Sequence, residues 1–206
     1  NGKPRQITVS LGVSKRFTIE HLQQLYEGIK LACDVYGVDL IGGDTSASAT
    51  GLLISITCIG EGESGKIVYR NGAKDTDLIC VSGDLGAAYM GLQLLERERV
   101  ASEGIKDFQP KFAGKEYILE RQLKPEARKD IIEALDKAGI IPTAMMDISD
   151  GVASDLRHIL RASGVGAEVE TERIPTSGQL NVYCKEFGLD PIELALCGGE
   201  DYELLF

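Results

Sequence analysis

The sequence predicts an α/β protein built from two domains, and three observations support this prediction. Apolar runs with the length of strands alternate with longer amphipathic runs of helical period along the 206 residues. A polar turn at residues 71–75 interrupts this alternation, which sets the boundary between a domain of residues 1–72 and a domain of residues 73–206. Three turns combine glycine with acidic residues at the ends of apolar runs, and they are the candidate functional sites of the chain.

The first domain is expected to contain four strands and one helix. Thr18 is the expected N-cap of a helix whose apolar residues recur at helical spacing as far as Gly37. The strand after this helix is expected to be short and buried, and the last two strands are expected to pair as a hairpin across a glycine-rich connection. The four strands are expected at residues 6–11, 38–41, 52–59 and 67–70.

The second domain is expected to alternate between strands and helices. Pro125 at a first helical turn and Gly139 beyond a last one frame the clearest of these helices. Residues 98–115 are polar and irregular, which predicts a loop. Helices are expected at residues 86–97, 117–123, 125–138, 151–162, 180–187 and 191–196, and strands at residues 78–82, 143–148, 166–170 and 202–206.

The turn Asp147-Ile148-Ser149-Asp150-Gly151 places two carboxylates and a hydroxyl between a strand and a helix. Oxygen ligands at such a turn suit a hard cation such as Mg²⁺, and a helix N-terminus favours the phosphates that this cation carries. Taken alone, this turn favours the interpretation that Ser149 or Asp150 is only the N-cap of the helix. Two similar turns, at residues 42–45 and 198–201, favour a functional interpretation of all three.

A glycine-rich segment at residues 60–66, GEGESGK, nearly matches the phosphate-binding loop G-x-x-x-x-G-K-[ST]. Ile67 stands where the loop requires a hydroxyl that holds Mg²⁺, and a strand rather than a helix is expected to follow. We therefore interpret the segment as a hairpin loop. The glycines at residues 83–86 lack the G-x-G-x-x-G spacing of a dinucleotide site and are interpreted as a close-packed turn.

The net charge of −10, from 22 basic and 32 acidic residues, argues against nucleic acid as a partner, because a nucleic-acid binder presents a basic face to phosphates. Phosphorylated small molecules are not excluded, since divalent metals can bridge them to an acidic pocket. The five cysteines are odd in number, form no C-x-x-C pair and mostly lie in apolar runs, which predicts buried thiols in a reducing compartment. Without an apolar run of about eighteen residues or a signal peptide, we expect a cytoplasmic protein without membrane contact.

Six stretches, spread along nearly the whole chain, carry a family resemblance: LIGGDTSAS at 40–48, YRNGAKDTD at 69–77, GLQLL at 91–95, RQLKPEAR at 121–128, MMDISDGVASDLRHILRASGVGAE at 145–168 and CGGEDYELLF at 197–206. In sequence and in order they resemble the thiamine-monophosphate kinase family, whose superfamily also holds aminoimidazole ribonucleotide synthetase and selenophosphate synthetase. The pair DISDG and GGEDYELL is the part of this resemblance most specific to the kinase.

The resemblance implies a two-domain aminoimidazole ribonucleotide synthetase-like fold, with mixed sheets flanked by helices. It implies an ATP-dependent phosphotransferase that converts thiamine monophosphate and ATP into thiamine diphosphate and ADP in one in-line step, with several Mg²⁺ ions and no general base. The first domain is expected to bind ATP and to form a homodimer. Family members carry an acidic metal-binding segment before residue 1 and a substrate-binding stretch after residue 206, so we expect this chain to be truncated at both ends. The alternatives are another ATP-dependent synthetase of the superfamily and a non-catalytic nucleotide-binding module.

The resemblance also implies roles for individual residues. It assigns Mg²⁺ to Asp44, Asp147 and Asp150, and the substrate to Glu200 and Asp201, with Glu203 as a weaker candidate. It assigns ATP to the residues Gly43, Asp44, Arg70, Ser149 and Tyr26. Structural alternatives stay open: Asp44 can cap its own turn, Arg70 can be an exposed charge, and Tyr26 can pack in the core. If the functional roles hold, the three aspartates should line one cleft at the domain junction.

Overall fold

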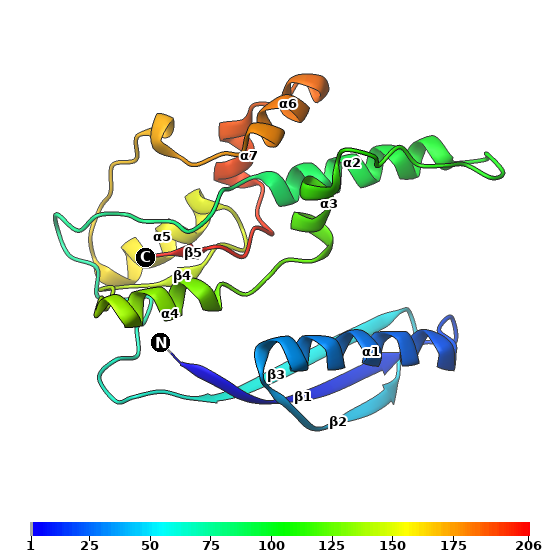
Figure 1. Ribbon diagram of the computed structural model, residues 1–206, viewed down its shortest axis with the longest axis horizontal. Helices are drawn as coiled ribbons and strands as arrows, with labels where there is room; N and C mark the ends of the chain where they lie inside the picture. The colour runs from blue at the N-terminus through cyan, green and yellow to red at the C-terminus, as the bar shows by residue number, and fades with distance from the viewer. Residues whose placement is uncertain (1) are drawn as a thin grey trace. The chain divides into compact units, whose positions relative to one another are not determined.

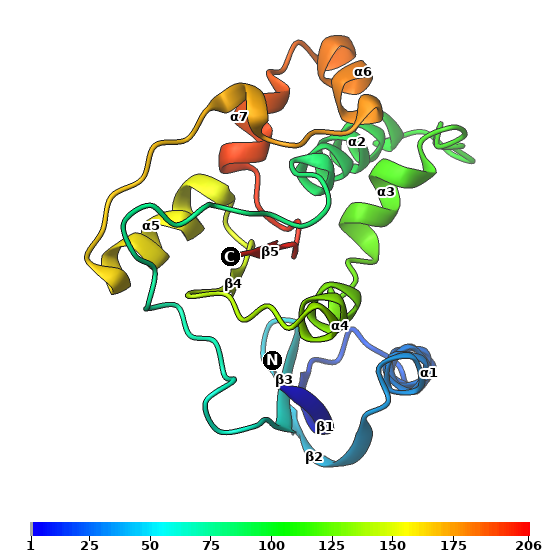
Figure 2. The ribbon, with the colours of Figure 1, turned by 60° about the vertical axis from the view of Figure 1, so that its left-hand side comes forward.

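The computed structural model describes residues 2–206, which form two compact units (Figures 1 and 2). The first unit ends at Ile67, and the second spans Val68–Phe206. Helices combine with one mixed and one antiparallel sheet, so the predicted α/β class is confirmed.

The N-terminal unit is a three-stranded sheet with one helix. β1 (Lys3–Val13) lies between β2 (Asp39–Ala47), to which it is parallel, and β3 (Leu52–Glu61), to which it is antiparallel. The helix α1 (Ile19–Tyr36) makes the crossover from β1 to β2 (Figure 1). Its predicted ends are confirmed.

The ends of α1 follow from local chemistry. The Thr18 side chain accepts a hydrogen bond from the His21 backbone, and the Thr18 amide donates to His21 Nδ1 at 3.1 Å, which makes a reciprocal cap at the start of the helix. Gly37 ends the helix in the left-handed conformation at φ 67°. Alternate residues of β1 pack on Ile29 and Cys33 of α1, and these residues are Ile7, Val9 and Leu11.

The outer strands of this sheet are more exposed than the sequence predicts. β2 was expected to be buried, yet all of its residues are exposed, and β3 is exposed from Leu53 onward. The reason is geometric, because the buried core of this unit consists of residues of the central strand β1 and of α1. The large apolar side chains left exposed on the outer strands are Leu40, Ile41, Leu53, Ile54, Ile56 and Ile59.

The C-terminal unit surrounds a short antiparallel pair, β4 (Met146–Asp147) and β5 (Leu204–Leu205). Ile148, Leu156 and Leu205 belong to the apolar cluster around this pair. Figures 1 and 2 show α2 running beside α3, with α5 next to the strand pair. The helical segments are α2 (Ala87–Ser102), α3 (Glu116–Leu123), α4 (Lys129–Ala138), α5 (Val152–Ser163), the 3₁₀ turn η1 (Thr171–Arg173), α6 (Gly178–Phe187) and α7 (Pro191–Cys197).

Several strand predictions in and around this unit were wrong. Residues 67–70 do not pair with β3, because β3 pairs with β1 and the Tyr69 carbonyl accepts instead from the Met145 amide at 2.9 Å. Residues 78–82 contribute only a bridge between Val81 and Leu205, with Cys80 and Phe206 exchanging backbone hydrogen bonds. Residues 166–170 form no strand, and residues 143–148 form one only at β4.

Two further predictions need correction. The helix expected from Pro125 begins at Lys129, because Arg128 at its N-cap has a non-helical backbone and directs its side chain to Asp130 and Glu203. All five cysteines are free as predicted, but only Cys33 and Cys184 are buried, while Cys58, Cys80 and Cys197 are exposed. Among residues 2–206, no helix is long and apolar enough to span a membrane.

Candidate functional site

Two of the three acidic turns are joined by backbone hydrogen bonds in the C-terminal unit. The Ser149 carbonyl accepts from the Glu200 amide at 2.8 Å, and the Ile148 carbonyl accepts from the Tyr202 amide at 2.8 Å. The Ile148 amide donates in turn to the Glu203 carbonyl at 2.8 Å. These bonds continue the β4–β5 pairing past the ends of both strands, so residues about fifty positions apart in sequence form one site.

Glycine permits this close approach at two positions. Gly199 has φ 71°, and a Cβ atom there would lie 2.5 Å from the Ser149 carbonyl oxygen. Gly151 has φ 95°, and a Cβ atom there would lie 2.5 Å from the Leu196 carbonyl oxygen. Any larger residue would combine an unfavourable backbone conformation with a collision, against the first turn at position 199 and against the end of α7 at position 151.

Asp155, which the sequence did not single out, shapes the first turn. Its side chain is 1% exposed and accepts hydrogen bonds from the Ser149 and Asp150 amides, each at 3.0 Å. The N-cap of α5 is Gly151, without a side-chain cap, so the interpretation of Ser149 or Asp150 as the capping side chain is wrong. Asp147 and Asp150 are left exposed with their carboxylates available to a ligand.

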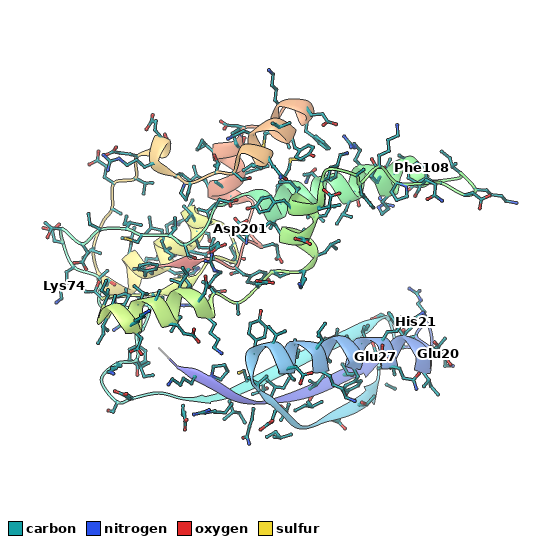
Figure 3. All side chains as sticks on the ribbon, viewed as in Figure 1. Glu20, His21, Glu27, Lys74, Phe108 and Asp201 are labelled. Atoms are coloured by element: carbon teal, nitrogen blue, oxygen red, sulfur yellow. The ribbon has the colours of Figure 1, made fainter. Side chains whose placement is uncertain are left out.

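The two acidic residues of the second turn lie in different environments, since Glu200 is exposed and Asp201 is buried. Glu200 is exposed, and its carboxylate accepts a hydrogen bond from the Tyr202 hydroxyl at 3.1 Å. Asp201 is 1% exposed and accepts from the Gly86 amide at 2.8 Å and the Ala88 amide at 3.4 Å. It therefore supplies the acceptor that α2 lacks, since the N-cap residue Gly86 has no side chain. Figure 3 shows Asp201 among the side chains of the C-terminal unit.

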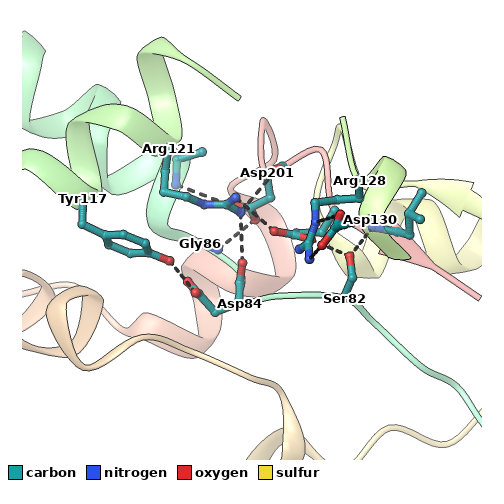
Figure 4. A network of polar contacts seen from close by, with 11 residues as sticks. Ser82, Asp84, Gly86, Tyr117, Arg121, Arg128, Asp130 and Asp201 are labelled. Atoms are coloured by element: carbon teal, nitrogen blue, oxygen red, sulfur yellow. Dashed lines mark hydrogen bonds and ion pairs between the residues drawn. The ribbon is translucent and has the colours of Figure 1, made fainter. Parts of the chain in front are cut away.

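A network of buried charged side chains contacts the turn at residues 198–201 and the strand that follows it (Figure 4). Glu203 is 2% exposed and accepts from Arg121 at 3.0 Å, and also from Arg128 and the Ser82 hydroxyl. Arg121 donates in addition to the backbone carbonyls of Asp84 at 3.1 Å and Asp201 at 3.2 Å. The Glu203 carboxylate is therefore buried and fully hydrogen-bonded, and it does not face the exposed site.

Asp84 and Tyr117 extend the network. The Tyr117 hydroxyl donates to Asp84, and burial followed by this hydrogen bond raises the pKa of Tyr117 well above its usual value. The pKa of Arg128 is likewise raised, first by its hydrogen bond with Asp130 and further by the charge of Glu203. These groups stay protonated at neutral pH, so the network keeps its charges fixed.

The substitution Asp201→Asn is expected to change how stability depends on pH. Burial raises the pKa of Asp201 from 3.8 to about 6, although the hydrogen bonds from Gly86 and Ala88 act in the opposite direction. The folded state therefore binds more protons than the unfolded state between these pH values. The contribution of Asp201 to stability is present below pH 3.8 and is lost as the pH rises through about 6, by on the order of 1–3 kcal/mol. Asparagine does not titrate, so the variant should lack this loss.

Urea unfolding of both proteins between about pH 4 and pH 7 measures this difference. The unfolding free energy of the wild type should fall relative to that of the variant as the pH rises. Parallel pH profiles would show that Asp201 titrates as it does in the unfolded chain.

The third acidic turn lies in the N-terminal unit, where the structure brings together three of the predicted ATP-binding residues. Tyr26, Gly43 and Asp44 line one pocket, with Leu40, Ile41, Gly42 and Thr45. The Ser46 hydroxyl donates to the Asp44 carboxylate at 2.9 Å. Tyr26 also packs against the core of this unit, as the structural alternative holds.

The remaining candidates lie outside these clusters. Arg70 is exposed in the C-terminal unit, next to the residue that pairs with Met145. The segment resembling a phosphate-binding loop forms a turn closed by the Lys66 amide and the Glu63 carbonyl at 3.1 Å, without a following helix. The prediction of a hairpin loop is wrong, because residues 67–70 form no strand and β3 pairs with β1 instead.

The oxygen ligands of the joined turns fit a magnesium ion whose remaining ligands are substrate phosphates. Within residues 2–206, no three His, Cys, Asp or Glu side chains are grouped closely enough to hold a metal ion. Mg²⁺ in nucleotide sites is held through one or two carboxylates together with substrate phosphates, so a complete protein cage is not required. Asp147 and Asp150 provide such a pair of exposed oxygen ligands.

Comparison with known proteins gives the family. The family models for the N-terminal and C-terminal domains of AIR synthase related proteins match residues 1–61 and 75–200. The chain is 37% identical to thiamine-monophosphate kinase of Aquifex aeolicus over 100% of its length and 62% of the relative's. It is 34% identical to thiamine-monophosphate kinase of Bacillus subtilis, covering 98% of the chain and 58% of that relative.

A solved structure described as "AaThiL complexed with AMPPCP and TMP" superposes with a TM-score of 0.87 at 37% identity. The alignment covers 100% of this chain and 62% of that one. The chain thus spans about three fifths of the length of these relatives. With both domain models matched in order along its length, the chain belongs to the AIR synthase related protein family.

Proposed function

We propose that the protein is a thiamine-monophosphate kinase, which transfers the γ-phosphoryl group of Mg-ATP to thiamine monophosphate and releases thiamine diphosphate and ADP. The observation that carries the proposal is the joining of two acidic turns, with Asp147, Asp150 and Glu200 exposed at one site. The similarity of the whole chain to proteins named thiamine-monophosphate kinase supports the choice of reaction.

The metal ligands in this proposal are Asp44, Asp147 and Asp150. Both substrates are anionic, so mutual repulsion of their phosphates is the main obstacle to the reaction. Magnesium ions, when bound, neutralise this charge and stabilise the developing charge of the transferred group. The two aspartates of the first turn are held in place because Asp155 fixes the backbone between them.

The nucleotide contacts are proposed at two places. In the N-terminal unit, the pocket lined by Tyr26, Gly43 and Asp44 offers an aromatic side chain and a glycine backbone to the nucleotide. In the C-terminal unit, Ser149 and Arg70 offer a hydroxyl and a guanidinium to phosphate oxygens. The attacking phosphate oxygen is already ionised at neutral pH, so the proposed reaction needs no general base and no phosphoenzyme.

The substrate side of the site is proposed at Glu200. A carboxylate there can pair with the aminopyrimidine or with the cationic thiazolium ring of thiamine monophosphate. Asp201 was a second candidate from the sequence, but its buried carboxylate is already bonded to the Gly86 and Ala88 amides. We therefore propose that Asp201 positions the turn and that Glu200 makes the contact.

The domain roles are also part of the proposal. We assign ATP binding and homodimer formation to the first domain, and the substrate side to the second. The exposed apolar residues of the outer strands, such as Leu53 and Ile56, support a dimer contact there. Sedimentation of the full-length protein should give twice the mass of one chain. The five free cysteines support a cytoplasmic location.

The direct test is to incubate the full-length protein with Mg-ATP and thiamine monophosphate and to quantify thiamine diphosphate and ADP. Equal amounts of both products are expected. Product formed only with a different acceptor would identify another synthetase of the superfamily. Binding of ATP without any product would identify a non-catalytic nucleotide-binding module.

A further inference from the structure

The turn that carries Glu200 has an unusual backbone. Glu200 has φ 63° and Tyr202 has φ 51°, so two residues with side chains adopt the left-handed conformation on either side of Asp201. This conformation is unfavourable for residues other than glycine and persists only where surrounding contacts impose it. Such contacts are present on each residue of the turn.

The contacts come from three directions. The amides of Glu200 and Tyr202 bond to the first acidic turn, and the buried Asp201 carboxylate bonds to the start of α2. The Asp201 carbonyl accepts from Arg121 at 3.2 Å, within the network of Figure 4. The backbone is therefore fixed independently of the two side chains that it projects, Glu200 and Tyr202.

These two side chains interact with each other beside the first acidic turn. The Tyr202 hydroxyl donates to Glu200 Oε2 at 3.1 Å. Burial raises the pKa of Tyr202, as do the hydrogen bond to Glu200 and the charges of Glu200, Asp147 and Asp150. The hydroxyl is the donor in this contact, and the Glu200 carboxylate is the acceptor.

We propose that Tyr202 is a positioning residue that holds the Glu200 carboxylate in the orientation in which it meets thiamine monophosphate. This inference rests on the proposed function of the site. A glutamate side chain is flexible, so an unrestrained Glu200 carboxylate would take several orientations beside the first acidic turn. One hydrogen bond from a neutral hydroxyl restrains the carboxylate without removing the charge that recognises a cationic ring.

The test is the affinity of the full-length protein for thiamine monophosphate, measured by calorimetry with Mg²⁺ and the non-hydrolysable analogue AMPPCP present. Tyr202→Phe removes only the hydroxyl and should weaken this affinity about tenfold, as expected for a hydrogen bond to a charged group. The affinity for Mg-AMPPCP itself should change less than about twofold. Tyr183→Phe is the matched control, because its hydroxyl donates to the Gly114 carbonyl at 2.9 Å away from the acidic turns.

A double-mutant cycle with Glu200→Gln separates positioning from a direct contact. In the Glu200→Gln background, Tyr202→Phe should have no further effect on the affinity for thiamine monophosphate. A tenfold loss that persists in this background would overturn the inference, as would a Tyr202→Phe variant that binds like the wild type. If Tyr202→Phe fails to fold, the affinity of the Glu200→Gln variant for thiamine monophosphate tests the inference instead. Glu200 is exposed, so this substitution should not disturb the fold, and an unchanged affinity would overturn the inference.

Turnover distinguishes this inference from the proposed function. A wild type that binds thiamine monophosphate but forms no thiamine diphosphate contradicts the proposed kinase activity. The role of Tyr202 is then still tested by comparing the affinities of the wild type and the Tyr202→Phe variant for thiamine monophosphate. An active enzyme in which Tyr202→Phe binds normally contradicts the role of Tyr202 alone. A wild type that does not bind thiamine monophosphate contradicts both.

Discussion

Asp147→Asn or Asp150→Asn is expected to lower the turnover of the full-length enzyme by about three orders of magnitude, since a bound metal contributes several kcal/mol of transition-state stabilisation. The fold should change little, because both side chains are exposed and the turn is held by Asp155 instead. Steady-state formation of thiamine diphosphate measures the first effect, and thermal unfolding measures the second.

Two controls make this result specific to the acidic turns. Asp136→Asn makes the same chemical change at an exposed position on α4 and should leave turnover within about twofold of the wild type. Lys66→Ala alters the segment that resembles a phosphate-binding loop and should also leave activity nearly intact. If activity survives both Asp147→Asn and Asp150→Asn, the assignment of the metal ligands is wrong.

Arg121→Met is expected to destabilise the C-terminal unit by about 3–5 kcal/mol, the usual effect of removing one partner from a buried ionic network. The substitution keeps a long side chain but leaves the buried carboxylates of Asp201 and Glu203 without one of their cationic partners. The Asp84 and Asp201 carbonyls would lose a donor as well (Figure 4). Denaturant unfolding of the purified variant gives the value.

Arg99→Met is the matched control for this stability effect. Arg99 also pairs with two carboxylates, Glu96 and the C-cap residue Glu103, but all three side chains are exposed. Exposed pairs contribute little, so a change below about 1 kcal/mol is expected. Equal effects of Arg121→Met and Arg99→Met would show that the network around Glu203 has no special role in stability.

The elements that the sequence predicts well are those specified by neighbouring residues. Thr18 and Gly37 bound α1 as expected, and Pro191 begins α7, because caps and first turns depend on local hydrogen bonds and backbone geometry. The failures include several strands, together with the helix start predicted at Pro125. Residues 67–70 have the composition of a strand, but whether they form one depends on a partner elsewhere in the chain, and Tyr69 pairs with Met145 instead.

The same distinction applies to the candidate site. Short motifs make Asp147, Asp150 and Glu200 candidates, whereas the hydrogen bonds of Asp155 and Tyr202 are visible only in the folded chain. Asp155 carried a weak local signal, as an acidic residue in the first turn of α5. The local signal of Asp201 was misleading. Its motif suggests contact with a ligand, but its carboxylate accepts a hydrogen bond from the amide of Gly86, 115 residues earlier in the chain.

The central claim is that the first acidic turn holds the metal that accompanies the nucleotide. Its most direct test is the affinity of the full-length protein for Mn-AMPPCP, followed by the paramagnetic signal of the manganese ion. The double variant Asp147→Asn/Asp150→Asn should bind this complex at least about tenfold more weakly than the wild type, with an unchanged unfolding temperature. Unchanged affinity for Mn-AMPPCP in the double variant would contradict the account.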